Sequence, residues 1–304
     1  MSLENFKGWK NWVDYKNNPL LTPKAPEWLV ADPTFIPPGD SPDGKWHLFA
    51  HGILFGIKHF IASDGIKWVR TNSKNISSGM RPFLYKENNT YYLFYESISN
   101  PLKSTICYRQ SSDLFNWSKP RIVLTPSLSW EGKISQNVSN PCFIKINGKY
   151  RLYYSGGSVF LRDCLFSEPK YIGFAESINI QGPYRKNPEP IIIPTKAHKF
   201  RNFGAGAMKV LKINDIWIGF NNGIYKDQYG RSRSSILLLY SHNGIEWLDL
   251  FRHPIIFPTE GWKNSFVYQL DVRKIGQNYW LYYNARHGWA VGWESIGLAT
   301  LNIP

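Results

Sequence analysis

The sequence has little cysteine, with only Cys107, Cys142 and Cys164 among 304 residues. An odd count without paired spacing predicts neither a disulfide framework nor a zinc site, so we expect three reduced thiols. No run of about 20 apolar residues that could span a membrane is present. The opening segment MSLENFKGWK lacks the apolar core of a signal peptide, which makes a cytoplasmic location the default expectation.

Acidic residues are scarce relative to basic ones. The sequence has 22 Asp and Glu against 36 Lys and Arg, a formal net charge of +14. Such a field favours anionic partners, acidic glycans among them. The basic residues are dispersed, with no block of about five like charges that would mark a nucleic-acid-binding tail. We therefore expect no nucleic acid partner.

Motifs of several other enzyme classes are also absent. We find no nucleophile-elbow serine, no phosphate-binding glycine loop and no cluster with metal-ligand spacing. SGGS at 155–158 is an isolated glycine turn with no helix signal after it. These absences argue against serine hydrolase, nucleotide-binding and zinc chemistry.

Aromatic residues, glycine and proline are plentiful, and long helical patterns are missing. Aromatics make up 16% of the sequence, with 24 Gly and 20 Pro, which indicates many short strands joined by turns. Three segments align without a gap and read as strand, tight turn and Tyr-rich strand: RPFLYKENNTYYLFYE (81–96), NPCFIKINGKYRLYYS (140–155) and QLDVRKIGQNYWLYYN (269–284). Segments 207–222 and 32–51 fit the same hairpin pattern less closely.

A third strand follows each hairpin, and in all but the last unit a polar corner and a fourth strand come after it. The corners lead to an aromatic residue, as in Ser63-Asp64-Gly65 before Trp68, and the fourth strands end in RIVLTP, PIIIP or PIIFP. NPLLTP at 18–23 is such an ending with no preceding unit, whereas the last unit is one strand short. We therefore predict an all-β, five-bladed β-propeller over residues 1–304, a single domain closed by pairing of the N-terminal strand with the last blade. A β-sandwich is the alternative.

In a propeller the first strand of each blade lines the central channel, and the second strand runs antiparallel to it. Strand starts and strand ends therefore meet at one mouth. The predicted ring of starts is Asp32, Arg81, Asn140, Ala207 and Gln269, and the ring of ends is His51, Glu96, Ser155, Asn222 and Asn284. The repeats vary most at these positions, which favours a ligand site there.

The segment EWLVADPTFI places Asp32 at the head of the first blade, directly before a proline. An Asp-Pro pair is also a common turn, so a capping role is the simpler alternative. Together with NGKYRLYYSGG and the Ser-x-Asp-Gly-x-x-Trp corner, ADPTFI resembles the five-bladed glycoside hydrolases of family 43. The resemblance implies that Asp32 is the general base. The family also has an Asp in the second blade that tunes the pKa and a Glu in the third blade that is the general acid. In this sequence the two positions hold Phe83 and Cys142, which cannot take those roles. The sequence therefore resembles a divergent branch of the family.

Glycoside hydrolysis needs a second carboxyl group, as proton donor. Glu96 is our candidate, with an ion pair to Arg81 as the alternative interpretation. Asp271 is expected to be a structural group near the axis and Glu294 a rim acid. Glu131 and Glu260 are expected to be solvated loop acids that could swing over the site.

The mouth also carries cations and aromatic rings. Arg81, Arg286 and His287 suit an acidic group on a sugar, and Trp289 could stack on a ring. Arg286 could instead pair with a neighbouring acid, and the tryptophan could pack between blades.

The leading hypothesis is a glycoside hydrolase acting on an oligo- or polysaccharide that can be acidic. The alternatives are a non-catalytic sugar-binding propeller and a glycoside phosphorylase in which phosphate replaces water. We expect a monomer that needs no cofactor, and a structural ion on the propeller axis is compatible with the pattern.

Overall fold

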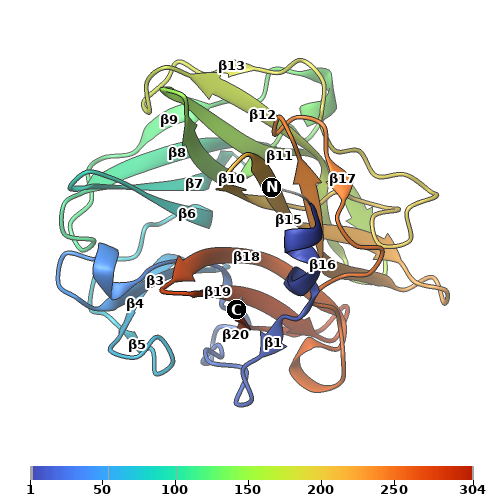
Figure 1. The fold of residues 1–304 in the computed structure, drawn as a ribbon, viewed down its shortest axis with the longest axis horizontal. Helices are drawn as coiled ribbons and strands as arrows, with labels where there is room; N and C mark the ends of the chain where they lie inside the picture. The colour runs from blue at the N-terminus through green and yellow to red at the C-terminus, as the bar shows by residue number, and fades with distance from the viewer. Residues whose placement is uncertain (1–2, 54, 101, 303–304) are drawn as a thin grey trace.

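The protein folds into strands and short 3-10 helices (Figure 1), as seen in a computed structural model that describes residues 3–53, 55–100 and 102–302. No α-helix occurs in these ranges. The 3-10 helices are η1 (Leu3–Lys10), η2 (Pro38–Asp40), η3 (Ser129–Glu131) and η4 (Gly261–Lys263). The all-β prediction is confirmed.

Three antiparallel four-stranded sheets follow one another in sequence. The first contains β2 (Ala31–Ile36), β3 (Trp46–Gly52), β4 (Gly56–Ala62) and β5 (Val69–Arg70). The second contains β6 (Gly79–Glu87), β7 (Thr90–Asn100), β8 (Lys103–Ser111) and β9 (Arg121–Leu124). The third contains β10 (Val138–Ile146), β11 (Lys149–Leu161), β12 (Phe166–Ser177) and β13 (Arg185–Lys186).

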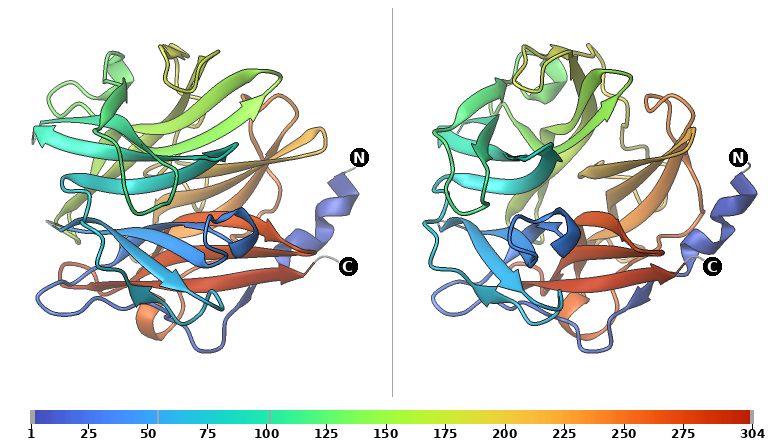
Figure 2. Two further views of the ribbon diagram at one scale, coloured as in Figure 1. Left: turned by 90° about the vertical axis from the view of Figure 1, so that its left-hand side faces the viewer. Right: turned by 60° about the vertical axis from the view of Figure 1, so that its left-hand side comes forward.

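The remaining eight strands form two further groups joined by one parallel pair, Ser234 with Phe266. One group contains β14 (Met208–Ile213), β15 (Ile216–Lys226), β16 (Ser232–Ser241) and β17 (Leu248–Asp249). The other contains β18 (Phe266–Ile275), β19 (Asn278–His287), β20 (Trp293–Asn302) and β1 (Val13–Asp14). The groups succeed one another around a common centre (Figures 1 and 2).

The N-terminal segment lies against the last group of strands. Val13 pairs with Thr300 of β20, and Leu21 in NPLLTP bridges Ile296 of the same strand. Ile192 in PIIIP and Ile256 in PIIFP make the equivalent single bridges to β12 and β16. NPLLTP therefore bridges the third strand of the last group, as PIIIP and PIIFP bridge the third strands of the two groups before it. The Pro-ended segments PIIIP and PIIFP are shorter than predicted, since each contributes a bridge rather than a strand.

The predicted corners are turns held by a side chain. Asp64 Oδ1 accepts hydrogen bonds from the backbone N–H groups of Ile66 and Lys67, each at 2.8 Å. Asp113 and Asn243 accept the same pair of bonds from the residues two and three positions after them. A short side-chain acceptor satisfies backbone donors that no strand can reach, which is why Asp or Asn recurs at this position.

The core consists of aromatic and aliphatic side chains packed between neighbouring sheets. Phe94 of β7 stacks on Phe143 of β10 with ring centroids 4.6 Å apart, and Trp46 of β3 stacks on Trp280 of β19 at 4.8 Å. These contacts join residues far apart in sequence. Burial of such rings fixes each sheet against the next and so positions the strand starts at the centre.

Candidate active site

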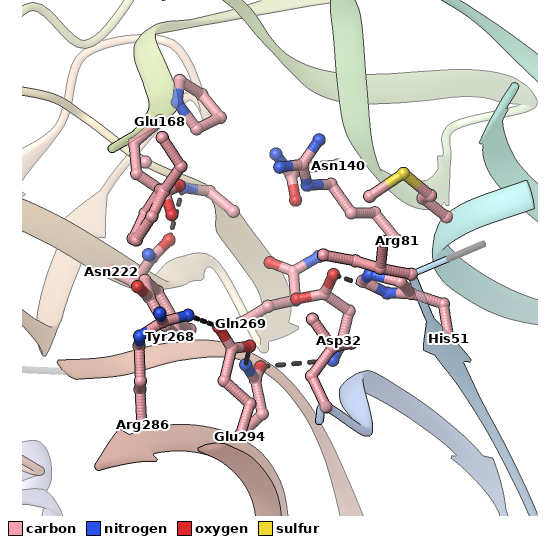
Figure 3. Close-up of a pocket in the computed structure, with 18 of the residues that line it drawn as sticks. Asp32, His51, Arg81, Asn140, Glu168, Asn222, Tyr268, Gln269, Arg286 and Glu294 are labelled. Carbon is pink, nitrogen blue, oxygen red and sulfur yellow. Dashed lines mark hydrogen bonds and ion pairs between the residues drawn. The ribbon is translucent and has the colours of Figure 1, made fainter. Parts of the chain in front are cut away.

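A polar pocket of about 230 Å³ lies at the centre, where the inner strands begin (Figure 3). Its lining includes all five predicted strand starts: Asp32, Arg81, Asn140, Ala207 and Gln269. Three of the predicted strand ends, His51, Asn222 and Asn284, line it too. Ser155 does not, because its buried hydroxyl donates to the carbonyl of Gly206.

A repeated backbone irregularity turns the strand starts toward the pocket. Asp32, Arg81 and Asn140 have φ of 52°, 50° and 51°, in the left-handed region. Each lies in a bulge where the strand register shifts. A left-handed non-glycine residue costs about 1–2 kcal/mol. Strain repeated at three equivalent positions around one cavity is typical of a functional site.

Asp32 is 7% exposed and is held from two sides. Its Oδ2 lies 2.9 Å from His51 Nδ1, in an alignment too poor for a hydrogen bond. Its backbone N–H donates to Asn284 Oδ1 at 3.2 Å. Burial alone would raise the pKa of Asp32, but His51, Arg81 and Lys209 outweigh burial and lower it below the usual value. The carboxylate is therefore ionised at neutral pH.

Glu96 lies beside this pocket and is bound to Arg81. Its buried carboxylate accepts a hydrogen bond from Arg81 Nη1. The ion pair, which was the alternative interpretation for Glu96, is thus present. Glu96 lines an adjoining cavity, and Arg81 lines both.

Glu168 was not predicted from the sequence, and it is the most perturbed acid of the pocket. It lies near the start of β12 and is half-buried in the lining, apart from Asp32 across the open space (Figure 3). Burial, together with the negative charges of Glu294 and Asp32, raises the pKa of Glu168 to about 8 against the opposing charge of Arg81. It precedes Pro169, as Asp32 precedes Pro33, and this acid-proline pattern was the available sequence signal.

The guanidinium of Arg286 donates hydrogen bonds to other groups of the protein. Its Nη1 donates to Glu294 Oε1 at 2.9 Å, and its Nη2 donates to the carbonyl of Trp289. Asn284 donates to the other oxygen of Glu294 at 3.1 Å. Burial raises the pKa of Glu294 despite the opposing charge of Arg286. The alternative in which Arg286 pairs with a neighbouring acid is therefore the observed arrangement.

Besides His51 Nδ1, two buried polar atoms in the lining have no hydrogen-bond partner within the described ranges. They are the hydroxyl oxygen of Tyr268 and Nε2 of Gln269. A buried donor without a partner costs about 1–3 kcal/mol. A ligand with hydroxyl groups could satisfy both. Gln269 was predicted, and Tyr268 was not.

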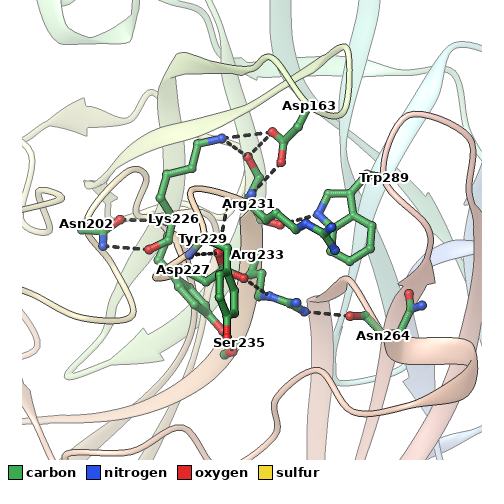
Figure 4. Close-up of polar contacts among 12 residues, drawn as sticks. Asp163, Asn202, Lys226, Asp227, Tyr229, Arg231, Arg233, Ser235, Asn264 and Trp289 are labelled. Atoms are coloured by element: carbon green, nitrogen blue, oxygen red, sulfur yellow. Dashed lines mark hydrogen bonds and ion pairs between the residues drawn. The ribbon is translucent and has the colours of Figure 1, made fainter.

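Besides Ser155 and Glu96, two predicted residues lie outside the pocket lining. His287 is exposed, with Nδ1 3.0 Å from the carbonyl oxygen of Gly261. Trp289 packs against Arg231 and Arg233, and its Nε1 donates to the carbonyl of Ser232 (Figure 4). Trp289 is therefore a packing residue, which was the alternative to stacking on a sugar ring.

The other candidate acids divide into structural and exposed groups. Glu131 is fully buried, ion-paired with Lys186 and hydrogen-bonded to Tyr154, so the expectation of a solvated acid is wrong for it. Glu260 is exposed, as expected. Asp271 accepts hydrogen bonds from Thr34 and the backbone of Phe35, which agrees with a structural role.

Phe83 and Cys142, which stand where the family has its other two acids, lie near the buried side chain of Lys209. Lys209 Nζ donates to the carbonyl of Pro141 and lies 4.7 Å from the ring centroid of Phe83. Cys142 Sγ accepts from the backbone of Val210, and burial raises the pKa of this thiol to about 11. Neither Phe83 nor Cys142 reaches the pocket lining.

No group of three or more His, Cys, Asp or Glu suited to a metal ion is found in the part of the protein that the structure describes. Within the same ranges, none of the helices has the length and apolar character that crossing a bilayer requires.

No protein-family model matches the sequence, and the comparison with curated proteins finds no match. Solved structures do resemble it. A complex of BT0996 with RGII aligns with a TM-score of 0.72 at 14% identity, covering 98% of this protein and 95% of the other. An alpha-L-arabinofuranosidase from Lactobacillus brevis aligns at 0.65 and 12%, covering 92% of each protein.

A thermostable family-43 glycoside hydrolase aligns with a TM-score of 0.61 at 14% identity, covering 88% of each protein. Identity this low carries information about fold and not about chemistry. The protein has the β-propeller fold of the family-43 and related glycoside hydrolases, in a divergent form.

Proposed function

We propose that this protein is a glycoside hydrolase that uses Asp32 as general base and Glu168 as general acid. The observation that carries the proposal is that the pKa values of the two carboxyl groups are shifted in opposite directions. The pKa of Asp32 is lowered, whereas that of Glu168 is raised to about 8. At neutral pH one is ionised and the other protonated, as acid–base cleavage of a glycosidic bond requires.

The scaffold in this proposal is a five-bladed propeller closed by the N-terminal segment. The five groups of four strands, the β1–β20 pairing and the Leu21–Ile296 bridge support it. Closure in this way covers the edge of β20 that β19 does not pair with.

In the proposed reaction Asp32 removes a proton from water as the water attacks the anomeric carbon. Glu168 gives its proton to the departing glycosidic oxygen, so the leaving group departs neutral. His51 lies against the base, with Nδ1 2.9 Å from Asp32 Oδ2, and the unpartnered Tyr268 and Gln269 groups bind sugar hydroxyls.

Glu96, the donor predicted from the sequence, is less suited to the role. A carboxylate that accepts from a guanidinium is an acceptor only and has no proton to give. Arg81 would have to be displaced before Glu96 could act, so we assign the proton-donor role to Glu168.

The acidic-glycan idea is supported by the net charge of +14 more than by the pocket. Arg81 and Arg286 are paired with Glu96 and Glu294, which leaves little uncompensated charge for a carboxylate or phosphate ligand. If an acidic group is bound, affinity should fall with salt, since screening acts over about 8–10 Å at physiological ionic strength. Equal binding to neutral and acidic glycans, unchanged by Arg286→Ala, would remove the idea.

The test is a panel of neutral and acidic polysaccharides, assayed for released sugar with and without inorganic phosphate. Asp32→Asn should lower turnover by about 10²–10⁴-fold and leave glycan binding nearly intact. Product formed only with phosphate would indicate phosphorolysis. Binding without cleavage across the panel would contradict the enzyme proposal and favour a sugar-binding propeller.

A further inference from the structure

Three turns beside the central pocket carry large apolar side chains that are exposed to solvent. They are the turns that join β11 to β12, β15 to β16 and β19 to β20. Leu165 is 71% exposed, Tyr229 78% and Val291 88%, one in each turn, and Phe160 near the end of β11 is 53% exposed. These turns border the pocket, since Phe166, the residue after Leu165, belongs to its lining.

The turns at the opposite ends of the same strands are polar. They read Asn-Gly, Asn-Asp and Gly-Gln, at residues 147–148, 214–215 and 276–277. Polar and glycine residues therefore suffice to connect these strands, and the fold does not require apolar side chains in a turn. Apolar side chains gathered on the surface beside a pocket are typical of an interaction site.

Polar contacts hold the three turns against one another (Figure 4). Asp163, in the first turn, accepts hydrogen bonds from the backbone N–H of Ser232 at 2.6 Å and from its hydroxyl at 2.5 Å. Trp289, in the third turn, donates from Nε1 to the carbonyl of Ser232 at 2.9 Å. The turns therefore form one surface. We call it the turn surface, and its members are Phe160, Arg162, Leu165, Tyr229, Arg231 and Val291.

The turn surface is positively charged. The three turns contain two acidic residues, Asp163 and Asp227, and both are ion-paired with basic side chains of the adjacent strands. Arg162 and Arg231 are exposed, and neither has an ion-pair partner among the residues that the structure describes. The net charge of the whole protein, +14, has the same sign. The exposed groups of this surface are thus apolar or cationic.

We propose that the turn surface docks on an anionic lipid bilayer, with the mouth of the central pocket next to the membrane. Apolar and aromatic side chains enter the boundary between headgroups and acyl chains, while arginines are attracted to anionic lipids. Side chains on separate turns can all insert, because a bilayer requires no complementary shape. The core of a protein–protein interface is instead depleted of charged residues, whereas two arginines stand among these apolar side chains.

This inference goes beyond the proposed function, because it concerns the place where the pocket meets its ligand and not the reaction. A glycan that reaches the pocket of the docked protein is one presented at a membrane surface. Docking itself requires neither Asp32 nor Glu168, so it can be measured without any glycan.

The test is sedimentation of the purified protein with vesicles of phosphatidylcholine alone, or of phosphatidylcholine and phosphatidylserine at about 7:3, which carry a negative surface potential. The protein should bind the anionic vesicles and not the neutral ones, and added salt should weaken the binding. Val291→Ser should lower the partition coefficient by about tenfold, because it removes an inserted apolar side chain. Arg162→Ala should lower it by about fivefold.

Two variants are matched controls. Val69→Ser changes a valine that is 64% exposed on β5, and Lys149→Ala removes an exposed charge at the other end of β11. Both should bind like the wild-type protein. Absence of binding to anionic vesicles, or a loss of binding that the controls share, would overturn the proposal. Self-association that Val291→Ser abolishes, without vesicle binding, would overturn it too and assign the surface to a second copy of the protein. Failure of glycan cleavage would leave the vesicle result unchanged.

Discussion

His51 Nδ1 lies 2.9 Å from Asp32 Oδ2, and both side chains are buried at the centre of the molecule. Among the groups that lower the pKa of Asp32, His51 contributes most, ahead of Arg81 and Lys209. A buried carboxylate would otherwise tend toward its neutral form, because burial penalises charge. The pair therefore determines the lowest pH at which Asp32 can accept a proton.

The first prediction concerns this pair. His51→Ala removes the largest opposing influence, so the pKa of Asp32 should rise. The acid limb of kcat/KM should then move to higher pH. A pH–rate profile of the purified variant measures the shift. Circular dichroism checks that the fold is kept, and an acid limb unmoved from that of the wild type would exclude Asp32 as the group that titrates there.

The second prediction separates Glu168 from Glu96. Glu168→Gln should abolish the alkaline limb near pH 8 and slow natural substrates by about 10²–10⁴-fold. Activated aryl glycosides should be much less affected, because their leaving groups need no proton. Glu96→Gln is the matched variant, and it should change both substrates alike through its contact with Arg81. The opposite pattern would return the donor role to Glu96.

The third prediction follows from linkage. A carboxyl group whose folded-state pKa is raised to about 8 binds more protons in the native state than in the unfolded one. Stability should therefore fall as pH rises from about 4.5 to 8. Glu168→Gln should be more stable than wild type at pH 8 and no more stable at pH 4. Urea unfolding at the two pH values measures this, and equal effects at both would contradict the raised pKa.

The fourth prediction tests the N-terminal segment. Trp9 is 2% exposed, with its ring 4.8 Å from that of Tyr279 in the last group of strands. Trp9→Ala should cost about 3–5 kcal/mol of unfolding free energy, because it leaves a cavity in the core. Lys10→Ala, exposed and adjacent, should cost little. A Trp9→Ala protein that unfolds like wild type would argue against a stabilising role for this segment.

The hairpin repeats could be predicted from sequence because their information is local. Alternating apolar residues, tight turns and Asp or Asn at the corners specify each unit without reference to the others. The alignment of the repeats also placed the strand starts correctly: Asp32, Arg81, Asn140, Ala207 and Gln269 all line the pocket. Periodicity sufficed there, because equivalent positions in equivalent units face the same axis.

Glu168 was not predicted because the site was predicted from the hairpins alone. It lies on a third strand, β12, outside the repeated pair of strands from which the site was predicted. Its perturbed pKa arises from residues in other groups, namely Glu294, Asp32 and Arg81, and from burial in a shared cavity. The acid-proline pattern at Glu168 and Pro169 marks the residue, but it carries no information about these contacts.

The sequence alone determined the hairpins, how they repeat and which residues begin them, because these depend on neighbours along the polypeptide. Only the tertiary structure decided that Glu96 is held by Arg81, that Arg286 is held by Glu294, and that Trp289 packs against two arginines. Ion pairs and ring contacts depend on side-chain distances across folded strands and loops. Such distances are set by packing of the whole molecule and not by spacing in the sequence.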